Sequence, residues 1–409
     1  MERTILHIDL NNFFASVECK YAPELASGYM AVIGNVEDRH GIILAKNQKA
    51  KEKGVKTGML LRDAEKLCPG IVFVEANHDR YAYWSMRAKA LYRQYSEKVE
   101  SFGIDEAWVD VTGVKTANGG KDIADEIRER VKDELGLTVS VGVSFNKVFA
   151  KLGSDMKKPD GTTVISRENY KSLVWGLPVG DLLFVGHSTL DKLKRIGIES
   201  VGDLARSKLE YVSKYLGKFG ENLWFYANGE DKSPVLDSRN DGDIKSVGNS
   251  VTCYRDLTSE EDVAVMLSSL CESVSERLMR YDIGRAKSIS VGIRDSKLNW
   301  YAKQEKLNRP SVLSDDFFTS AMKLFNEMFD WSDSIRSLSV TVFDFADGEQ
   351  LDINVSDVEY MKRLNLMKTV GKIRDKYGAG SVRRGLSFKD RKLTKEGNGH
   401  GGSLPPAGK

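Results

Sequence analysis

Hydrophobic and polar positions in the first 165 residues follow short periods that predict alternating strands and helices. Residues 4–9 (TILHID) alternate and are rich in β-formers, so we expect a strand that ends at Asp9. Further strands are expected at 99–102, 107–111, 138–143 and 160–165, and helices at 78–97, 123–135 and 147–155. The segment over about 11–76 is interpreted as an insertion with short strands and helices of its own. Without it, the order is β-α-β-β-α-β, a ferredoxin-like unit.

Three carboxylates are expected to meet at one end of this sheet. Asp9 ends the first strand, and Asp105 and Glu106 lie in the connection that leads into the third. These two strands are neighbours at the sheet centre of a ferredoxin-like unit, so the acids can approach one another. Carboxylates held together repel unless a cation lies among them, and hard oxygen ligands suit magnesium. Two such ions support in-line displacement at phosphorus; the alternative is that these acids are solvated strand ends.

Beyond residue 165 the pattern predicts a helical region and then a second α/β unit. Glycines break residues 168–232 into short helices, and 185–204 is typical of a helix–hairpin–helix, with a possible second hairpin at 214–229. Strands are expected at 246–254, 286–294 and 336–345, and helices at 262–281, 315–329 and 358–378. The Gly-, Pro- and Lys-rich end, 389–409, has no apolar period, so we expect it to be disordered.

The composition indicates a soluble protein of several domains without identifying its partner. Of the 409 residues, 41% are apolar and 29% charged, and this length suggests two to four domains. The net charge of +2 lacks the basic excess that is usual for a nucleic-acid-binding protein. The four cysteines have no zinc-like spacing, and no apolar run approaches the ~18 residues of a membrane span. We therefore expect free thiols, no membrane segment and a cytoplasmic location.

Four segments carry a resemblance to a known family: HIDLNNFFASVE (7–18), SFGIDEAWVDVTG (101–113), VGVSFNKVFAKLGSDMKKPDGTTV (141–164) and KSVGNSVTCYRDL (245–257). In order and spacing the chain resembles the Y-family, lesion-bypass DNA polymerases, with a likeness to bacterial polymerase IV and UmuC-like proteins over about residues 3–386. The resemblance implies an α+β, right-hand polymerase fold. Its parts would be a ferredoxin-like palm (1–10 and 77–165), small fingers (11–76), a helical helix–hairpin–helix thumb (166–235), a linker (236–243), an α/β little finger (244–345), a C-terminal segment (346–388) and a tail (389–409).

The resemblance also implies an activity, which is template-directed, low-fidelity DNA synthesis without proofreading. The enzyme would add deoxynucleotides from their triphosphates to the 3′-OH of primer–template DNA, tolerate damaged templates and act as a monomer. Two magnesium ions, or manganese in their place, would be held by Asp9, Asp105 and Glu106 with help from the Leu10 carbonyl. A non-catalytic DNA-binding scaffold of the same fold is the alternative. A nucleotidyl cyclase would have no use for the thumb and the last α/β unit.

The same resemblance implies contacts to the incoming nucleotide. Phe14 matches the steric gate, whose ring leaves no room for a 2′-OH, and Phe13 would support it; otherwise the two rings belong to the core. Gln48 and Lys51 stand where the family has a tyrosine and an arginine, and a lysine lacks the bidentate fork of arginine. The residues matched to nucleotide contacts are Asn12, Gln48, Lys51 and Lys158.

Candidate DNA contacts lie in the first hairpin and in the last α/β unit. Such hairpins direct backbone N–H groups at phosphates without reading bases, and the candidates there are Gly186, Lys192 and Lys194. Basic residues on or near the predicted strands would follow the duplex backbone, unless they only face solvent; these are Arg255, Arg285, Arg294 and Lys297.

A possible partner-binding segment follows the last predicted strand. EQLDIN (349–354) resembles the sliding-clamp pentapeptide Gln-Leu-x-Leu-Phe. Gln350, Leu351 and Ile353 are therefore candidate contacts to a sliding clamp, although the aromatic end of the motif is missing.

Overall fold

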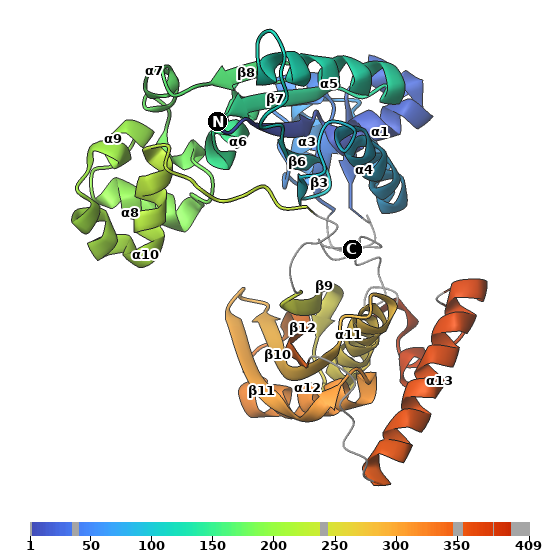
Figure 1. Ribbon diagram of the computed structural model, residues 1–409. Coiled ribbons are helices and arrows are strands. Elements are labelled where there is room, and N and C mark those ends of the chain that lie inside the picture. Colours follow the sequence, from blue (N-terminus) through green and yellow to red (C-terminus); the bar gives the residue numbers. More distant parts are fainter. Residues whose placement is uncertain (1, 35–40, 238–243, 347–354, 379, 394–409) are drawn as a thin grey trace. The chain divides into compact units, whose positions relative to one another are not determined.

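The computed structural model describes residues 2–34, 41–237, 244–346, 355–378 and 380–393 (Figure 1). The chain divides into two compact units, one formed mainly by residues 1–241 and the other mainly by 242–409. Each unit has buried clusters of its own. Within the described ranges, no helix has the length and apolar character needed to cross a membrane.

A five-stranded sheet lies at the centre of the first unit, in the order β5-β6-β1-β7-β8. Its strands are β1 (Ile5–Leu10), β5 (Val99–Phe102), β6 (Glu106–Asp110), β7 (Val139–Ser144) and β8 (Thr162–Ile165). Strand β1 runs antiparallel to both of its neighbours, β6 and β7, whereas β8 runs parallel to β7. The predicted ferredoxin-like order, with the first and third strands adjacent, is confirmed.

The two faces of this sheet carry different side chains of β1, because residues alternate along a strand. Leu6 and Ile8 are buried in the main core of the unit, and Ile5 lies in a second cluster to which α6 contributes. His7 and Asp9 have the same parity as Ile5 and so share its face. The helices around the sheet are α1 (Phe13–Tyr21), α4 (His78–Tyr92), α5 (Gly120–Leu135) and α6 (Lys147–Met156).

The predicted insertion forms a small sheet in the order β3-β2-β4. Its elements are η1 (Pro23–Ser27), β2 (Met30–Ile33), β3 (Ile43–Lys46), α2 (Gln48–Glu52), α3 (Leu61–Leu67) and β4 (Val72–Glu75). Ala31, Ile43 and Val55 belong to a separate buried cluster there. Helix α1 comes from the same stretch of sequence, but its Phe13 and Val17 pack in the core of the five-stranded sheet.

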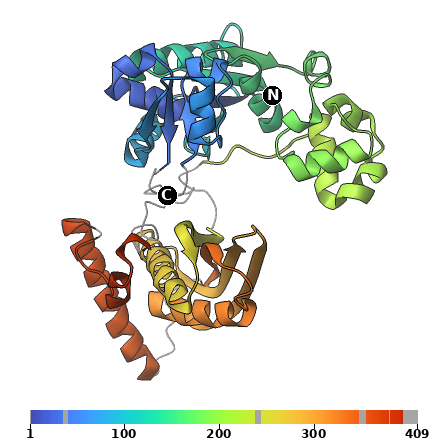
Figure 2. The ribbon, with the colours of Figure 1, turned by 180° about the vertical axis from the view of Figure 1, so that it is seen from behind.

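Residues 170–227 form short helices, as predicted, and Figure 2 shows them as a green group without strands. They are α7 (Tyr170–Val174), η2 (Val179–Asp181), α8 (His187–Arg195), α9 (Val201–Arg206) and α10 (Leu209–Ala227). Gly197, at φ +77°, follows α8, and Ser200 and Asp203 form a capping box that begins α9. Helix α10 is interrupted by Gly217 at φ +61°, within the second predicted hairpin.

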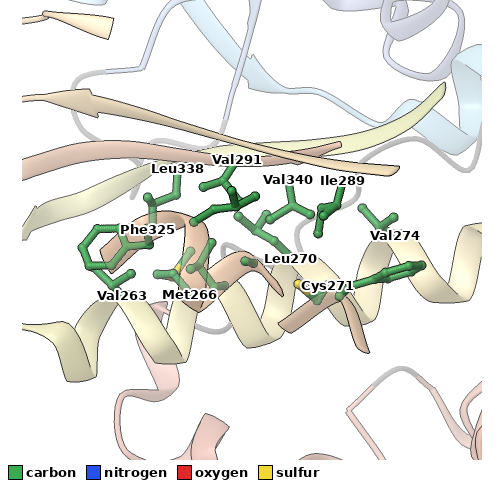
Figure 3. Packing of buried hydrophobic residues seen from close by; sticks show 14 of the residues in the cluster. Val263, Met266, Leu270, Cys271, Val274, Ile289, Val291, Phe325, Leu338 and Val340 are labelled. Carbon is green, nitrogen blue, oxygen red and sulfur yellow. The ribbon is translucent and has the colours of Figure 1, made fainter. Parts of the chain in front are cut away.

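The second unit is a four-stranded sheet, β11-β10-β12-β9, packed against helices. Its elements are β9 (Ser246–Leu257), α11 (Glu260–Arg280), β10 (Arg285–Asp295), β11 (Trp300–Ser311), α12 (Ser314–Met328) and β12 (Ile335–Ala346). Figure 3 shows the core, in which Met266 and Leu270 of α11 face Ile289 of β10 and Val340 of β12. The predicted strands and helices of this region are present, with one strand more than expected.

The additional strand, β11, was missed because its sequence lacks a buried face. It lies at the edge of the sheet and pairs only with β10. Most of its residues are exposed or half-buried, including Lys303, Glu305 and Lys306, and it contains Pro310. Charged side chains and proline are typical of edge strands, which they protect from pairing with other chains.

The chain end corrects another prediction, because residues 389–393 are ordered rather than disordered. Leu393 is fully buried in the core of the second unit, and Asp390 accepts a hydrogen bond from Arg255 (3.1 Å). They follow α13 (Val355–Tyr377) and η3 (Gly385–Phe388). Outside the described residues lie the remainder of the predicted tail (394–409), most of the predicted linker, and the candidate clamp contacts Gln350, Leu351 and Ile353.

Candidate active site

The end of β1 and the beginning of β6 lie side by side in the sheet. Asp9 is directly opposite Glu106 in the antiparallel register. The Leu10 N–H donates to the carbonyl oxygen of Asp105 (3.0 Å), which fixes the turn before β6 to the end of β1. Asp9 is 6% exposed, and Asp105 and Glu106 are half-buried. The sheet thus brings the three acids singled out from the sequence together at one end of its inner strands β1 and β6.

Two lysines from α6 and the loop after it pair with two of these carboxylates. Lys151 Nζ lies 2.9 Å from Glu106 Oε2, and Lys158 Nζ lies 2.6 Å from Asp9 Oδ2. Lys158 also contacts Asp155 Oδ1 at 2.7 Å. Lys158 was singled out from the sequence, whereas Lys151 was missed, because only the packing of α6 on the sheet reveals that it reaches Glu106.

Burial and neighbouring side chains together set the pKa values of the three carboxyl groups. It raises the pKa of Asp9 to about 7, although a paired lysine opposes the shift, and it also raises the pKa of Asp105, with Glu106 adding to the effect. For Glu106 burial acts in the same direction, but the contacts with His7 and Lys151 outweigh it and lower the pKa to about 2. Additional positive charge is therefore favourable beside Asp9 and Asp105.

The donor atoms at this end of the sheet suit a divalent cation, since carboxylates and the Leu10 carbonyl are hard oxygen ligands. In the part of the chain that is described, however, no group of three His, Cys, Asp or Glu side chains converges as a metal cluster. Two of the carboxylates face ammonium groups instead. A cation would compete with Lys151 and Lys158 for these oxygens.

His7 lies behind the carboxylates and was also missed. It is fully buried on the same face of β1 as Asp9, and its Nε2 is 3.2 Å from Glu106 Oε2. Burial lowers the pKa of His7 to about 4, so the ring is neutral at neutral pH. The available signal in the sequence was its spacing of two from Asp9, which places both side chains on one face of the strand.

The two phenylalanines at the start of α1 differ in their environments. Phe13 is buried in the core, whereas Phe14 is half-buried. Phe14 stacks on Tyr81 of α4, with ring centroids 4.0 Å apart and an interplanar angle of 11°, and it meets the His78 ring edge-on. The Tyr81 hydroxyl donates to Glu18 (2.8 Å), which fixes the ring beneath Phe14. Tyr81 was not singled out, because its helix gave no functional signal in the sequence.

Two of the four predicted nucleotide contacts line one cavity. Asn12, in the left-handed conformation at φ 48°, leads from β1 into α1. Asn12 and Gln48 line a cavity of about 410 Å³ together with Thr138. The Gln48 amide donates to Glu52 (3.1 Å), and Lys51 of the same short helix is exposed.

In the helical group, the residues predicted to bind DNA lie on α8. Gly186 is the N-cap of this helix, and no atom lies within 4 Å of the position that a Cβ would take there. Lys192 and Lys194 are exposed in its last turn. This arrangement leaves both lysines accessible to a phosphate backbone.

The four basic residues predicted in the second unit differ in how they are paired. Arg255 contacts Asp262 (2.6 Å) and Asp390 (3.1 Å), so carboxylates already surround its charge. The remaining three are more open: Lys297 is exposed and lies 2.9 Å from Asp333, Arg285 is half-buried with its guanidinium 5.7 Å from the Tyr360 ring centroid, and Arg294 is exposed.

Comparisons with known proteins cover both units. The impB/mucB/samB family matches residues 8–155, and the C-terminal domain of that family matches 244–354. A protein of Acetivibrio thermocellus named DNA polymerase IV is 46% identical, covering 97% of this chain and 100% of its own. DNA polymerase IV 1 of Bacillus subtilis is 34% identical, covering 97% and 95%. A solved Y-family DNA polymerase chimera of Dbh and Dpo4 shares the fold, with a TM-score of 0.75, 23% identity, and coverage of 84% of this chain and 100% of its own.

The sheet topology and the structural neighbours define the class of protein, an α+β polymerase fold of the Y family. Within that class, the chain belongs to the impB/mucB/samB family, and the two relatives described above are named DNA polymerase IV and DNA polymerase IV 1.

Proposed function

We propose that this chain is a template-directed, low-fidelity DNA polymerase that extends a primer 3′-OH across damaged template bases. One observation carries the proposal: the sheet register sets Asp9 opposite Glu106, with Asp105 beside them, inside the segment matched by the family. Burial raises the pKa of Asp9 and of Asp105, so a cation bound beside them would stabilise their charged forms. This favours a catalytic protein over a DNA-binding scaffold.

Divalent-metal dependence is a general property of the family, and we assign the ligands to Asp9, Asp105, Glu106 and the Leu10 carbonyl, with magnesium, or manganese in its place, as two ions. When bound, such ions activate the attacking oxygen and stabilise the leaving oxygen at phosphorus. Lys158 then has a second role, because its ammonium, released from Asp9, would lie near the site of a triphosphate.

Phe14 would select deoxynucleotides as a steric gate, with Phe13 anchoring the turn beneath it. The stack on Tyr81 supports this role, because it restricts movement of the Phe14 ring away from a larger sugar. Asn12, Gln48 and Lys51 would complete the contacts to the nucleotide. Lys51 would act as a point charge, without the bidentate geometry of an arginine.

The proposal extends to the division into palm, fingers, thumb, little finger and C-terminal segment given above. Primer–template DNA would contact the exposed N-terminus of α8 and the lysines of that helix. It would also contact the exposed basic side chains of the second unit, Arg294 and Lys297. The sliding clamp stays a possible partner through residues 349–354. A cytoplasmic monomer is proposed; the four cysteines, all within the described residues, form no disulfide, which suits a reducing compartment.

Primer extension by the purified full chain tests the proposal. With magnesium and the four deoxynucleotides, we expect extension on an undamaged template and insertion opposite an abasic site. The Asp105→Ala, Glu106→Ala double variant should lose both activities while retaining DNA binding. Exposed Asp79→Ala provides a carboxylate control. Unaltered extension by the double variant would show that the active site lies elsewhere, and a wild-type protein that binds DNA but never extends it would favour the scaffold.

A further inference from the structure

The His7 ring bridges the candidate metal ligand Glu106 and a serine of α6. Its Nε2 lies 3.2 Å from Glu106 Oε2, and its Nδ1 lies 2.8 Å from Ser154 Oγ. The ring is fully buried, Ser154 is 1% exposed, and the Trp108 ring meets His7 edge-on at 5.2 Å between centroids. The imidazole therefore has little freedom to turn away from the carboxylate.

The fold builds this contact through a close approach of α6 to the sheet. Gly142 of β7 is opposite His7 in the register. A Cβ at Gly142 would lie 1.9 Å from the Ala150 carbonyl oxygen and 2.5 Å from the Ser154 nitrogen. The helix backbone thus occupies the space that a side chain would need, and Ser154 reaches His7 because that side chain is missing.

The position of the His7 ring proton decides which group donates in the hydrogen bond between His7 and Ser154. A neutral imidazole carries one N–H, and a serine hydroxyl donates one hydrogen bond. Two acceptors lie within reach of the Ser154 hydroxyl: His7 Nδ1 and the Lys151 carbonyl oxygen at 2.7 Å. When Ser154 donates to Nδ1, the ring proton resides on Nε2, which lies 3.2 Å from Glu106 Oε2; the two buried atoms are close but not aligned as a hydrogen bond in this structure. The opposite tautomer would set a nitrogen lone pair against a carboxylate oxygen in a buried site, which is unfavourable.

We infer that His7, held in its Nε2–H tautomer by Ser154, is a positioning residue that keeps the Glu106 carboxylate in place for a divalent cation; this rests on the proposed role of Glu106 as a metal ligand. Lys151 contacts the same carboxylate from α6 at 2.9 Å. The ammonium charge competes with a cation for the carboxylate, whereas the neutral N–H of His7 does not. His7 can therefore hold Glu106 both before and after a cation arrives.

Metal binding and histidine NMR test this inference on the full chain without DNA or nucleotide. Mn²⁺ affinity, measured by electron paramagnetic resonance, should fall by about 10–100-fold in His7→Phe, the range found when a residue supporting a metal ligand is lost. His7→Gln retains an N–H donor and should bind Mn²⁺ more tightly than His7→Phe. Ser144→Ala removes another buried serine, on β7, that donates to the Ile165 carbonyl (2.8 Å), and the affinity of this variant should match the wild type.

The tautomer has its own readout, which a purely structural role would not move. In ¹⁵N spectra of the metal-free protein, the resonances lost in His7→Gln identify His7 among the five histidines. They should show a protonated Nε2 in the wild type, and Ser154→Ala should shift them toward a mixture of tautomers and weaken Mn²⁺ binding.

Two results separate the inference from the proposed function. If Asp105→Ala, Glu106→Ala abolishes Mn²⁺ binding but Ser154→Ala and His7→Phe bind as the wild type does, the positioning role of His7 is wrong and the metal site stands. If the double variant binds Mn²⁺ as the wild type does, the assignment of Glu106 as a ligand fails, and the inference fails with it.

Discussion

At the scale of single residues, the ring of Phe14 has a defined support. Its stack on Tyr81, at 4.0 Å between centroids, positions a flat hydrophobic surface beside the end of β1. Aromatic pairs of this kind contribute about 0.5–1.5 kcal/mol beyond the area they bury. Under the proposed function, this stack would hold in place the ring that rejects a 2′-OH.

Replacing Phe14 by alanine should admit ribonucleotides. The smaller side chain removes the steric contact, so incorporation of ribonucleotides relative to deoxynucleotides should rise by roughly 10–200-fold, the range over which pocket size discriminates. Single-nucleotide primer extension with each triphosphate measures this ratio. Tyr83→Ala, which removes an exposed aromatic ring of the same helix as Tyr81, is the control. Unchanged discrimination in Phe14→Ala would remove the steric gate from this position.

If Asp9 is a metal ligand as proposed, its raised pKa would make metal binding dependent on pH. Its pKa is raised to about 7 in the metal-free protein, whereas Glu106, at about 2, is ionised throughout the working range. A cation binds the ionised carboxylate, so binding releases a proton from Asp9 wherever it is protonated. Below pH 7, Mg²⁺ affinity should therefore fall as pH decreases, by up to about tenfold per pH unit for one coupled proton.

Calorimetric titrations of Mg²⁺ in buffers with different ionisation enthalpies measure the released protons. We expect proton release at pH 6 and little at pH 8, and the Asp9→Asn variant should show neither the release nor the pH dependence. The sign also fixes the effect on folding. A carboxyl whose folded pKa is raised favours the folded state below that pKa, and this stability declines as pH rises from about 4 to 7.

At the scale of elements, the packing of α6 against the sheet determines where three charged or polar groups lie. Lys151 and Ser154 both come from this helix, and Lys158 follows it. Gly142 permits the approach, since the Ala150 carbonyl oxygen would lie 1.9 Å from a Cβ at that position. The position of α6 is therefore set by a residue that has no side chain.

Gly142→Ala should lower the free energy of unfolding by at least about 3 kcal/mol, the upper end of the usual cost of overpacking, because the clash involves backbone rather than a flexible side chain. Urea unfolding followed by circular dichroism measures this change. Gly28→Ala is the matched control, since no atom lies within 4 Å of the added Cβ and its φ is −111°. Equal stability of Gly142→Ala and the wild type would mean that α6 can shift without cost. Gly142 would then not determine how closely α6 packs on the sheet.

Elements with an apolar buried face could be predicted from the sequence, and those without one could not. Strand β1 alternates between Leu6 or Ile8 in the main core and His7 or Asp9 on the other face, so its period was visible. Strand β11 is stabilised by its hydrogen bonds to β10, and its exposed side chains carry no apolar period. The order of strands in the central sheet followed from the pattern, because the ferredoxin-like connection restricts it.

The candidate site, like the fold, could be predicted only in part from the sequence. Asp9, Asp105 and Glu106 could be placed together from topology alone, since adjacent strands carry them. Lys151 and His7 could not, because their contacts depend on how a helix packs across the sheet. Likewise, Leu393 looked like part of a polar tail, and its burial depends on packing against core residues that are far away in sequence.

At the scale of the whole molecule, the net charge of +2 does not describe what a DNA backbone would meet. Many basic side chains are matched by carboxylates within the fold, as Arg255 is by Asp262 and Asp390. Within the described residues, by contrast, Lys192 and Lys194 are exposed together at the end of α8. DNA affinity should therefore depend on a few local groups rather than on total charge.

The salt dependence of DNA binding tests this distribution. Each phosphate neutralised by a lysine contributes about 0.9 to the slope of log affinity against log salt concentration. Lys192→Ala, Lys194→Ala should therefore reduce the magnitude of that slope by about 2, and should weaken binding similarly on different DNA sequences, because phosphate contacts carry no base information. Fluorescence anisotropy of a labelled primer–template at several salt concentrations measures the slope.

Arg255→Ala is the informative comparison, since Asp262 and Asp390 already neutralise this guanidinium, and its slope should remain close to that of the wild type. A large loss of slope in Arg255→Ala, with none in the double lysine variant, would place the DNA on the second unit rather than on α8.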